Sequence, residues 1–315
     1  MRHAVLILAF LATPVGAFAA CPPPPPAQRD IIADSYYDNP PVNSHINRQK
    51  FARYEAAVGP IEQYMGTVAR MASSGAPDDA QCAVRWLTAW AEGDAMLGKI
   101  KKEQAHYERK WVLTGLALSY AKVRNAASRD QAASINVWLQ AIADGVMQHS
   151  AKYKGSRNNH YYWEGLAVAA TGAATGNTRD VEWGRKVFAY AGTQIAADGT
   201  LPLEMKRGAR ALHYHLFAAA PLAMLESILN ENSPKLAKLA AFCVAGLQHP
   251  DTVAKRAKAP QTGILDDDGD WLAVYARRHP SPDIAALLAK SKPPFVNRLG
   301  GALDKPNPLE HPTVQ

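Results

Sequence analysis

This chain has few cysteines, no long apolar run beyond its N-terminus, and no stretch in which polar and apolar residues alternate. Three cysteines without CxxC spacing do not supply the ligands of a structural zinc site. Spanning a bilayer takes roughly 20 consecutive apolar residues, and no such run follows the N-terminus. Because strand alternation is missing, the sequence excludes a fold built on a half-buried β-sheet.

The N-terminus has the pattern of a secretory signal peptide. A basic start precedes an apolar run over residues 4–11, and small residues end at Ala19. We therefore expect residues 1–19 to be removed and the mature protein to reach the periplasm or the medium. Cleavage before Cys21 with lipidation of that residue is the alternative.

Export makes a disulfide possible, and the three cysteines permit at most one. Sequence does not choose the pair. A link between Cys21 and Cys82 would tie a proline-rich arm, over residues 20–48, to the first helices. Cys243 lies in an apolar run over residues 239–247, where a small buried hydrophobic residue is the expectation.

The charge balance favours anionic partners. The chain carries 35 Lys and Arg against 28 Asp and Glu, a formal net charge of +7. An exported basic protein is suited to polyanions such as acidic polysaccharides or nucleic acid. Moderate basicity is also common in exported bacterial proteins, so charge alone does not identify the partner.

Apolar residues recur at three- and four-residue spacing along most of the chain, which predicts helices. Short breaks between them imply antiparallel neighbours, as in a bundle, a solenoid or a ring of helical hairpins. We predict one all-α domain over residues 49–315. The series of apolar residues at this spacing begin at Phe51, Ile61, Cys82, Val112 and Ile135. Further helical segments are expected over residues 165–174, 179–196, 211–229, 234–247, 270–276 and 284–288.

Two segments stand outside the helical pattern. Residues 34–47 are polar and aromatic, with two prolines, and have the composition of a lid loop or of an ordinary connector. Residues 290–315 are rich in Lys, Pro and Gly, and we expect them to wrap the outside irregularly.

Residues 158–163, with the sequence NNHYYW, crowd two amides, an imidazole and three aromatic rings into one block. One interpretation is a helix start in which Asn158 or Asn159 is the cap and Tyr162 and Trp163 begin the buried face. A functional interpretation is compatible with it, because the free N–H groups at a helix N-terminus attract anions.

A second block, RGARALHYH, covers residues 207–215. On a continuous helix, Arg207 and Tyr214 would lie within about 20° on one face and about 10 Å apart along the axis. Gly208 allows Arg207 to lie in the entering loop instead. His213 and His215 point to different sides of such a helix, and no HExxH spacing supports a metal site.

The two blocks carry a resemblance. The runs NNHYYW and LPLEMKRGARALHYH, at matching separation, resemble the polysaccharide lyase family that includes periplasmic alginate lyases acting on poly-mannuronate. The similarity extends over most of the mature chain. It includes the start at Cys21, Tyr36-Tyr37, residues 81–92, Arg109-Lys110-Trp111 and the closing Arg298-Leu299-Gly300-Gly301. It implies an incomplete α/α barrel, or toroid, with a deep cleft.

The resemblance implies β-elimination on a 4-linked polyuronate, which gives C4=C5 unsaturated products without a metal or organic cofactor. Removing the C5 proton requires that the neighbouring carboxylate be neutralised by hydrogen bonds and positive charge. By resemblance, Asn159, His160 and Arg207 have this role. Tyr214 is the matching acid and base, or else the acid alone with His160 as the base.

Tyrosine has an ordinary pKa near 10, so a phenolate base near neutral pH needs roughly 3–4 kcal/mol of stabilisation. Arg207 or a protonated His160 could supply it. We expect further substrate contacts from six residues: Arg157, Arg210, Tyr36, Tyr161, Trp163 and Lys50.

The expected partner is an acidic polysaccharide, with poly-mannuronate preferred and glucuronan and hyaluronan as further candidates. We expect a monomer with no nucleic-acid partner and no membrane span. One alternative is an inverting glycoside hydrolase using carboxylates such as Glu164, Asp198 or Glu204. The other is a non-catalytic polyanion-binding protein.

Overall fold

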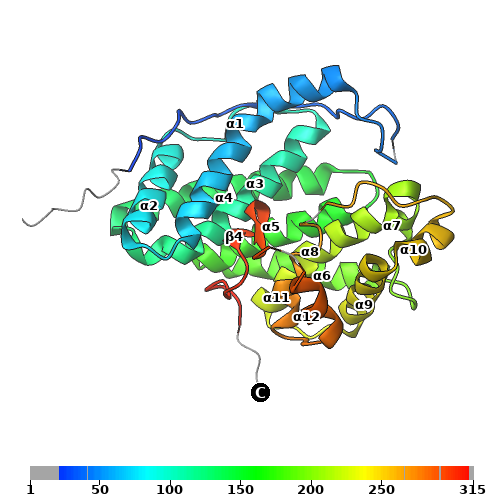
Figure 1. Cartoon of the computed structure of the whole chain (residues 1–315). Helices are drawn as coiled ribbons and strands as arrows, with labels where there is room; N and C mark the ends of the chain where they lie inside the picture. The colour runs from blue at the N-terminus through cyan, green and yellow to red at the C-terminus, as the bar shows by residue number, and fades with distance from the viewer. Residues whose placement is uncertain (1–20, 41, 266, 291, 312–315) are drawn as a thin grey trace, which may run out of the picture.

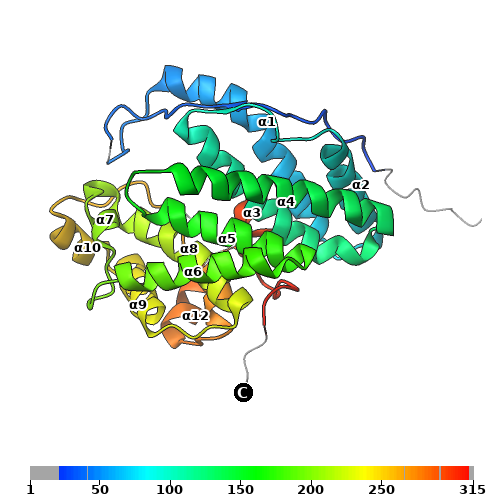
Figure 2. The same ribbon diagram turned by 180° about the vertical axis from the view of Figure 1, so that it is seen from behind.

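The computed structural model describes residues 21–40, 42–265, 267–290 and 292–311. They form an incomplete α/α toroid of helical hairpins, which confirms the all-α prediction (Figure 1 and Figure 2). The expected signal peptide lies outside these residues. The longer helices are α1 (Arg48–Ser73), α2 (Pro77–Glu92), α3 (Glu103–Val123), α4 (Arg129–Lys152), α5 (Asn159–Thr175), α6 (Thr178–Gln194), α8 (Ala211–Leu229) and α9 (Pro234–Gln248).

Shorter elements connect or follow these helices. They are β1 (Ile31–Ile32), β2 (Ile100–Lys101), η1 (Arg124–Ala126), α7 (Pro202–Met205), η2 (Gly208–Arg210), α10 (Pro250–Ala257), α11 (Leu272–Ala276), α12 (Pro282–Leu288), β3 (Phe295–Val296), η3 (Asn297–Leu299) and β4 (Gly301–Ala302). Strand β1 pairs with β2 in parallel, and β3 pairs with β4 in antiparallel register.

Helix α5 lies at the centre, against α3, α4, α6 and α8. Because neighbours surround it, almost every residue from Tyr162 to Ala174 is buried, and the helix has no polar face. Helix α8 is similarly apolar. The segment Gly208–Leu229 is long and apolar enough to cross a membrane, but 83% of its apolar window is buried inside the protein. It is therefore a core helix.

Helix boundaries differ from the sequence expectations in three places. The stripes beginning at Phe51 and Ile61 belong to one helix, α1, which contains Pro60. Helix α5 begins at Asn159, ahead of the expected segment 165–174. The short helices α7 and α10 were not expected, because fewer than three turns do not show a helical period.

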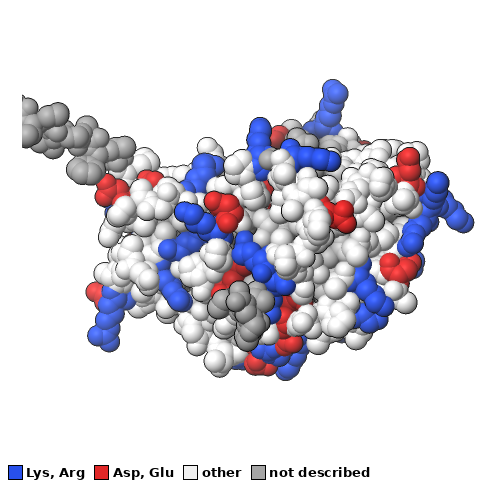
Figure 3. Space-filling model, turned by 60° about the horizontal axis from the view of Figure 1, so that its bottom comes forward, with Lys and Arg blue, Asp and Glu red and all other residues white. Residues whose placement is uncertain are grey.

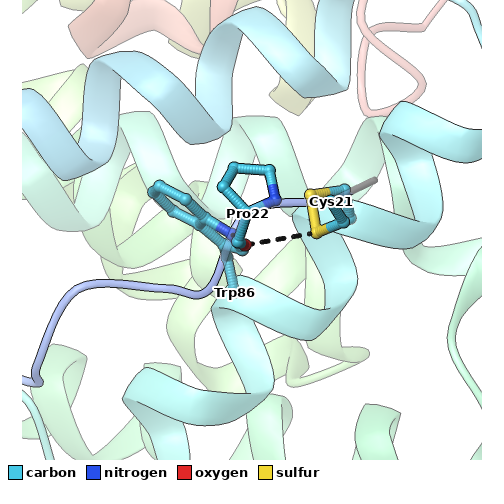
Figure 4. Close-up of a disulfide and its surroundings, with 4 residues drawn as sticks. Cys21, Pro22 and Trp86 are labelled. Carbon is cyan, nitrogen blue, oxygen red and sulfur yellow. Dashed lines mark hydrogen bonds between the residues drawn. A yellow bond between two sulfur atoms is a disulfide. The ribbon is translucent and has the colours of Figure 1, made fainter. Parts of the chain in front are cut away.

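The N-terminal arm is fixed to α2. Cys21 forms a disulfide with Cys82, with 5.5 Å between their Cα atoms (Figure 4). The indole nitrogens of Trp86 and Trp90 donate hydrogen bonds to the carbonyls of Pro22 and Pro25, at 2.9 and 3.0 Å. Free Cys243 is fully buried in α9, as expected of a small hydrophobic residue.

The expectation that residues 290–315 wrap the outside holds for only part of the described segment, since residues 292–293 and 304–306 are exposed but others are buried. Leu299, Leu303 and Leu309 are at most 7% exposed, and η3 packs against α3. The close approach depends on Gly115 of α3, where an added Cβ would lie 2.6 Å from the Asn297 carbonyl oxygen. The segment thus enters the core and carries Arg298 to the cleft.

Candidate active site

A cleft of about 720 Å³ opens between the loop before α1 and helices α3, α5 and α8. It is large enough for several sugar rings, since pockets for drug-sized ligands span about 300–1,000 Å³. Its wall combines aromatic rings with cations and imidazoles. The lining includes Tyr36, Tyr37, Asn43, Tyr54, Glu62, Tyr107, Trp111, His160, Trp163, Arg210, His213, Tyr214, Asp268 and Arg298.

The first turn of α5 places His160 in this cleft. Asn158 is the helix cap, and its side-chain oxygen accepts a hydrogen bond from the His160 backbone N–H at 3.2 Å. The imidazole stacks on the Tyr107 ring, with 3.7 Å between centroids. Burial, together with the charges of Lys110 and Arg207, holds the pKa of His160 well below its usual range. His160 is therefore neutral, and its Nδ1 has no hydrogen-bond partner among the described residues.

Tyr214 faces the cleft from the first turn of α8, and Arg207 lies over its ring. Their contact does not come from a continuous helix, because Gly208, with φ of +57°, turns the chain into η2 between them. The Arg207 guanidinium carbon is 3.4 Å from the centre of the Tyr214 ring, and that of Arg210 is 5.3 Å away. Gly208 thus brings the two together through the loop.

Burial raises the pKa of Tyr214 above its ordinary value, and the charges of Arg207 and Arg210 oppose the rise. The phenol is therefore protonated near neutral pH. From the sequence, either Arg207 or a protonated His160 was expected to stabilise a Tyr214 phenolate. The lowered pKa of His160 does not agree with the second of these. The free protein presents a neutral imidazole and a neutral phenol.

Asn159 and Arg207 lie behind the cleft wall and meet at Glu204 of α7. The Glu204 Oε1 atom accepts hydrogen bonds from the Asn159 backbone N–H and from its Nδ2, both at 2.9 Å. The Glu204 Oε2 atom is 3.9 Å from Nη1 of Arg207. The Nε and Nη2 atoms of Arg207 are buried without a hydrogen-bond partner in the described chain.

His215 fixes α7 against α8. Its Nδ1 is 2.7 Å from the Ala211 carbonyl, and its Nε2 accepts a hydrogen bond from the Leu201 backbone N–H at 2.9 Å. Since a carbonyl only accepts, Nδ1 carries the proton. Burial lowers the pKa of His215 to about 4, so the ring is neutral and this arrangement persists at neutral pH.

Three further predicted binding residues line the cleft. Tyr36 lies in an aromatic group with Tyr37 and Tyr54. Arg210 donates hydrogen bonds to the Tyr37 hydroxyl and to the Asn43 carbonyl, both at 2.9 Å. It thereby joins the loop of residues 34–47 to α8. Trp163 is 2% exposed, and its indole nitrogen donates to a backbone carbonyl.

The structure does not bring Arg157, Tyr161 or Lys50 to the lining of this cleft. Arg157 donates two hydrogen bonds to Ser150 and stacks on Tyr161, 4.4 Å from the ring centre. Lys50 pairs with Asp38 at 2.6 Å. It lines a neighbouring cavity of about 380 Å³, which shares Asp34, Ser35, Tyr37 and Tyr54 with the cleft.

Sequence reasoning did not propose Arg298, Tyr107, Trp111 or His213 as site residues. Arg298 lies over the Trp111 ring at 4.3 Å and pairs with Glu62 at 3.1 Å. Trp111 and Arg298 fall in the runs 109–111 and 298–301, which carried the family resemblance. That resemblance was the signal by which the sequence could have identified them as site residues. Asp268 accepts a hydrogen bond from Nδ1 of His213 at 2.8 Å if that nitrogen carries the proton.

The three carboxylates considered for a hydrolase lie outside this lining. Glu164 is buried and pairs with Lys110 at 3.1 Å. Asp198 pairs with Arg256 at the surface, and Glu204 is occupied by Asn159. Within the described ranges, no three His, Cys, Asp or Glu residues cluster as a metal site would require.

Solved structures share this architecture. Alginate lyase A1-III in complex with a tetrasaccharide aligns with a TM-score of 0.75 at 22% identity, covering 91% of this chain and 84% of the other. A structure of A1-III from Sphingomonas species A1 gives 0.72 at 22% identity, with 91% and 85% covered. At this identity the likeness establishes the fold alone.

Sequence relatives extend over nearly the whole chain. A polysaccharide lyase of Stenotrophomonas maltophilia strain K279a is 36% identical over 312 residues, which are 94% of this chain and 93% of the relative. Alginate lyases of Pseudomonas fluorescens Pf-5 and Azotobacter vinelandii DJ are 33% and 31% identical. These alignments cover 82% and 91% of this chain, and 75% and 83% of the relatives.

The fold and these relatives define the class of the protein, a polysaccharide lyase with an α/α toroid. The alginate lyase family profile matches residues 32–252. The chain belongs to the alginate lyase family, which confirms the resemblance carried by the blocks at residues 158–163 and 207–215.

Proposed function

We propose that this protein cleaves alginate at 4-linked mannuronate by β-elimination, leaving a C4=C5 double bond in the new terminal sugar. The observation that carries the proposal is the pairing of a neutral His160 with a protonated Tyr214 in one cleft, with Arg207 over the phenol. Relatives named alginate lyase support alginate as the substrate.

The substrate carboxylate at C5 must be neutralised before the C5 proton becomes acidic. Arg207, behind the cleft wall and over the Tyr214 ring, supplies positive charge for this step, and its Nε and Nη2, which have no partner among the described residues, are atoms through which a guanidinium pairs with a carboxylate. The Asn159 amide and the charge of Arg298 add to this field. Such preorganised donors stabilise the enolate-like dianion as its charge grows.

The proton transfers follow from the two neutral groups. His160 takes the C5 proton, the C5–H electron pair becomes the C4=C5 π bond, and the C4–O4 bond breaks with its pair on O4. Tyr214 donates its phenolic proton to O4, and the imidazolium then returns a proton to the phenolate. In mannuronate the C5 proton and O4 lie on the same ring face, so this sugar requires the base and the acid to approach from one side, and we propose that His160 and Tyr214, which both line the cleft, do so.

One assay distinguishes this function from the others. The protein is incubated with poly-mannuronate, polyguluronate, glucuronan and hyaluronan, and the ultraviolet absorbance of the C4=C5 double bond and the reducing ends are followed. We expect both signals to rise together and fastest on poly-mannuronate. Reducing ends without absorbance would identify a hydrolase, and binding without either signal would identify a carbohydrate-binding protein.

We also propose that the protein is exported to the periplasm. The Cys21–Cys82 bridge supports this, since disulfides persist in oxidising compartments. A bridged Cys21 has no thiol to carry a lipid, so the bridge argues against lipidation. Intact mass of protein from the periplasmic fraction tests both points. We expect a chain that lacks residues 1–19, carries no lipid and shows one free thiol before reduction.

A further inference from the structure

Glu204 contacts two of the groups that neutralise the substrate carboxylate in the proposed reaction. It is 1% exposed and projects from α7, whose position is fixed by the hydrogen bond between Leu201 and His215. One oxygen accepts hydrogen bonds from the backbone N–H and from Nδ2 of Asn159, and the other faces Arg207. Like Asn159 and Arg207, Glu204 lies outside the lining of the cleft, and its two oxygens face these two residues, so it acts on the sugar only through them.

The carboxylate determines how the Asn159 amide is oriented. Because the Asn159 Nδ2 donates to Glu204 Oε1, the amide nitrogen faces Glu204 and the amide oxygen faces away. Nδ2 retains a second N–H, and Oδ1 is buried without a partner among the described residues. The backbone bond fixes the same residue at the first position of α5. Asn159 therefore has a single orientation before substrate arrives.

Arg207 is fixed by a backbone hydrogen bond and lies beside the same carboxylate, whose Oε2 has no hydrogen-bond partner among the described residues. Its backbone N–H donates to the Glu204 carbonyl at 3.0 Å, and its Nη1 faces Oε2 at 3.9 Å. This leaves the Nε and Nη2 edge without a protein partner. Because burial raises the pKa of Glu204 while Asn159 and Arg207 oppose the rise, the two partners also favour the charged form of the carboxylate.

We propose that Glu204 is a positioning residue, which orients the Asn159 amide and the Arg207 guanidinium so that together they receive the C5 carboxylate. The proposal rests on the lyase function proposed above. Without Glu204, the amide can turn and the guanidinium can shift, and the transition state loses aligned donors. A displacement of about 1 Å at a reacting centre costs about 100-fold in rate.

The test compares Glu204→Gln with Glu226→Gln as a matched control. Glu226 is also 1% exposed, accepts a backbone N–H from Ser233, and contacts His279 Nε2 at 2.7 Å, but it does not line the cleft. On poly-mannuronate, we expect Glu204→Gln to lower kcat about 10- to 100-fold with KM changed less than about threefold. Glu226→Gln should lose thermal stability with kcat near wild type.

A double-mutant cycle shows whether Glu204 acts through Asn159. The combined loss in kcat for Glu204→Gln with Asn159→Ala should be at least about fivefold smaller than the product of the single losses. If Glu204→Gln does not fold, Glu204→Asp replaces it in the cycle. Asp keeps the charge but is one methylene too short to reach both partners, so the same non-additivity is expected.

The outcomes separate the two proposals. A Glu204 variant with wild-type kcat, or losses that multiply with those of Asn159→Ala, would overturn the positioning role. A wild-type protein that yields no absorbing product from any polyuronate overturns the lyase function instead. Loss of activity in Glu226→Gln equal to that in Glu204→Gln would make both effects structural and would also overturn the positioning role.

Discussion

His160 and Tyr214 are both uncharged in the free protein for the same physical reason. Removing either side chain from water penalises its charged form, which lowers the pKa of an imidazole and raises that of a phenol. The surrounding cations act in the same direction on His160 but oppose burial at Tyr214. The result is a proton acceptor and a proton donor that are both ready at neutral pH.

The pH dependence of kcat follows from these directions. Activity requires deprotonated His160, so it should rise with pH through a pKa below about 6.5, and it requires protonated Tyr214, so it should fall through a pKa above about 10. We expect a plateau between these limits in initial rates on poly-mannuronate. A rate that keeps rising tenfold per unit from pH 7 to 10 would instead make the Tyr214 phenolate the base.

Substitution of the two groups gives a residue-level prediction. Tyr214→Phe and His160→Ala should each reduce kcat about 10²- to 10⁴-fold, the usual contribution of a positioned acid or base. Neither change removes the cations of the cleft, so binding of a mannuronate oligomer by calorimetry should persist with unaltered circular dichroism. Tyr214→Phe with full activity would exclude the proposed proton donor.

At the scale of elements, the sequence predicted the features that depend on the local spacing of apolar residues and on the local residue types. The core faces of α1 to α4 follow from apolar spacing, and the cap at Asn158 from its amide and the aromatic run after it. The pairing of Arg207 with Glu204 was not predictable, since a four-residue helix has no periodicity. Nor was the path of η3, which depends on contacts between α3 and residues about 180 positions later.

Substitution of Arg298 tests whether η3 contributes to substrate binding in the cleft. Its guanidinium lies over Trp111, beside the ring system that holds His160, and reaches Glu62 at 3.1 Å. Removing it takes one cation from a cleft that binds an anionic polymer, so Arg298→Ala should raise KM for poly-mannuronate about tenfold, or 1.4 kcal/mol. The Arg298→Lys variant keeps the charge and should recover part of this loss. Unchanged KM in Arg298→Ala would remove η3 from the binding surface.

At the scale of the whole molecule, charge is dispersed over the surface. The face in Figure 3 shows Lys and Arg interspersed with Asp and Glu. A single basic stripe is therefore absent from that view. The cations that bear on substrate are instead those beside the cleft, such as Arg207, Arg210 and Arg298. Specific anion binding is a property of the cleft, while the net charge of +7 contributes general attraction.

The Cys21–Cys82 bridge has a predictable effect on global stability. It joins residues 61 positions apart, and closing a loop of that length in the unfolded chain is worth about 4 kcal/mol in the chain-entropy model. Cys82→Ser should therefore lower the free energy of unfolding in urea by up to this amount. Because α2 does not line the cleft, kcat at 25 °C should stay within about twofold of wild type. Equal unfolding midpoints with and without a reductant would mean that the bridge does not form in solution.

The same bridge makes residues 21–82 a covalently closed ring, and this ring contains both the loop over the cleft and all of α1. A protease that cuts the loop between Asp34 and Asn47 opens the ring but releases no fragment. Any rearrangement of the loop during substrate entry must likewise take place between two fixed ends. A nicked enzyme would migrate as one chain without reductant and as two with it, and it would keep its arm in place after the cut.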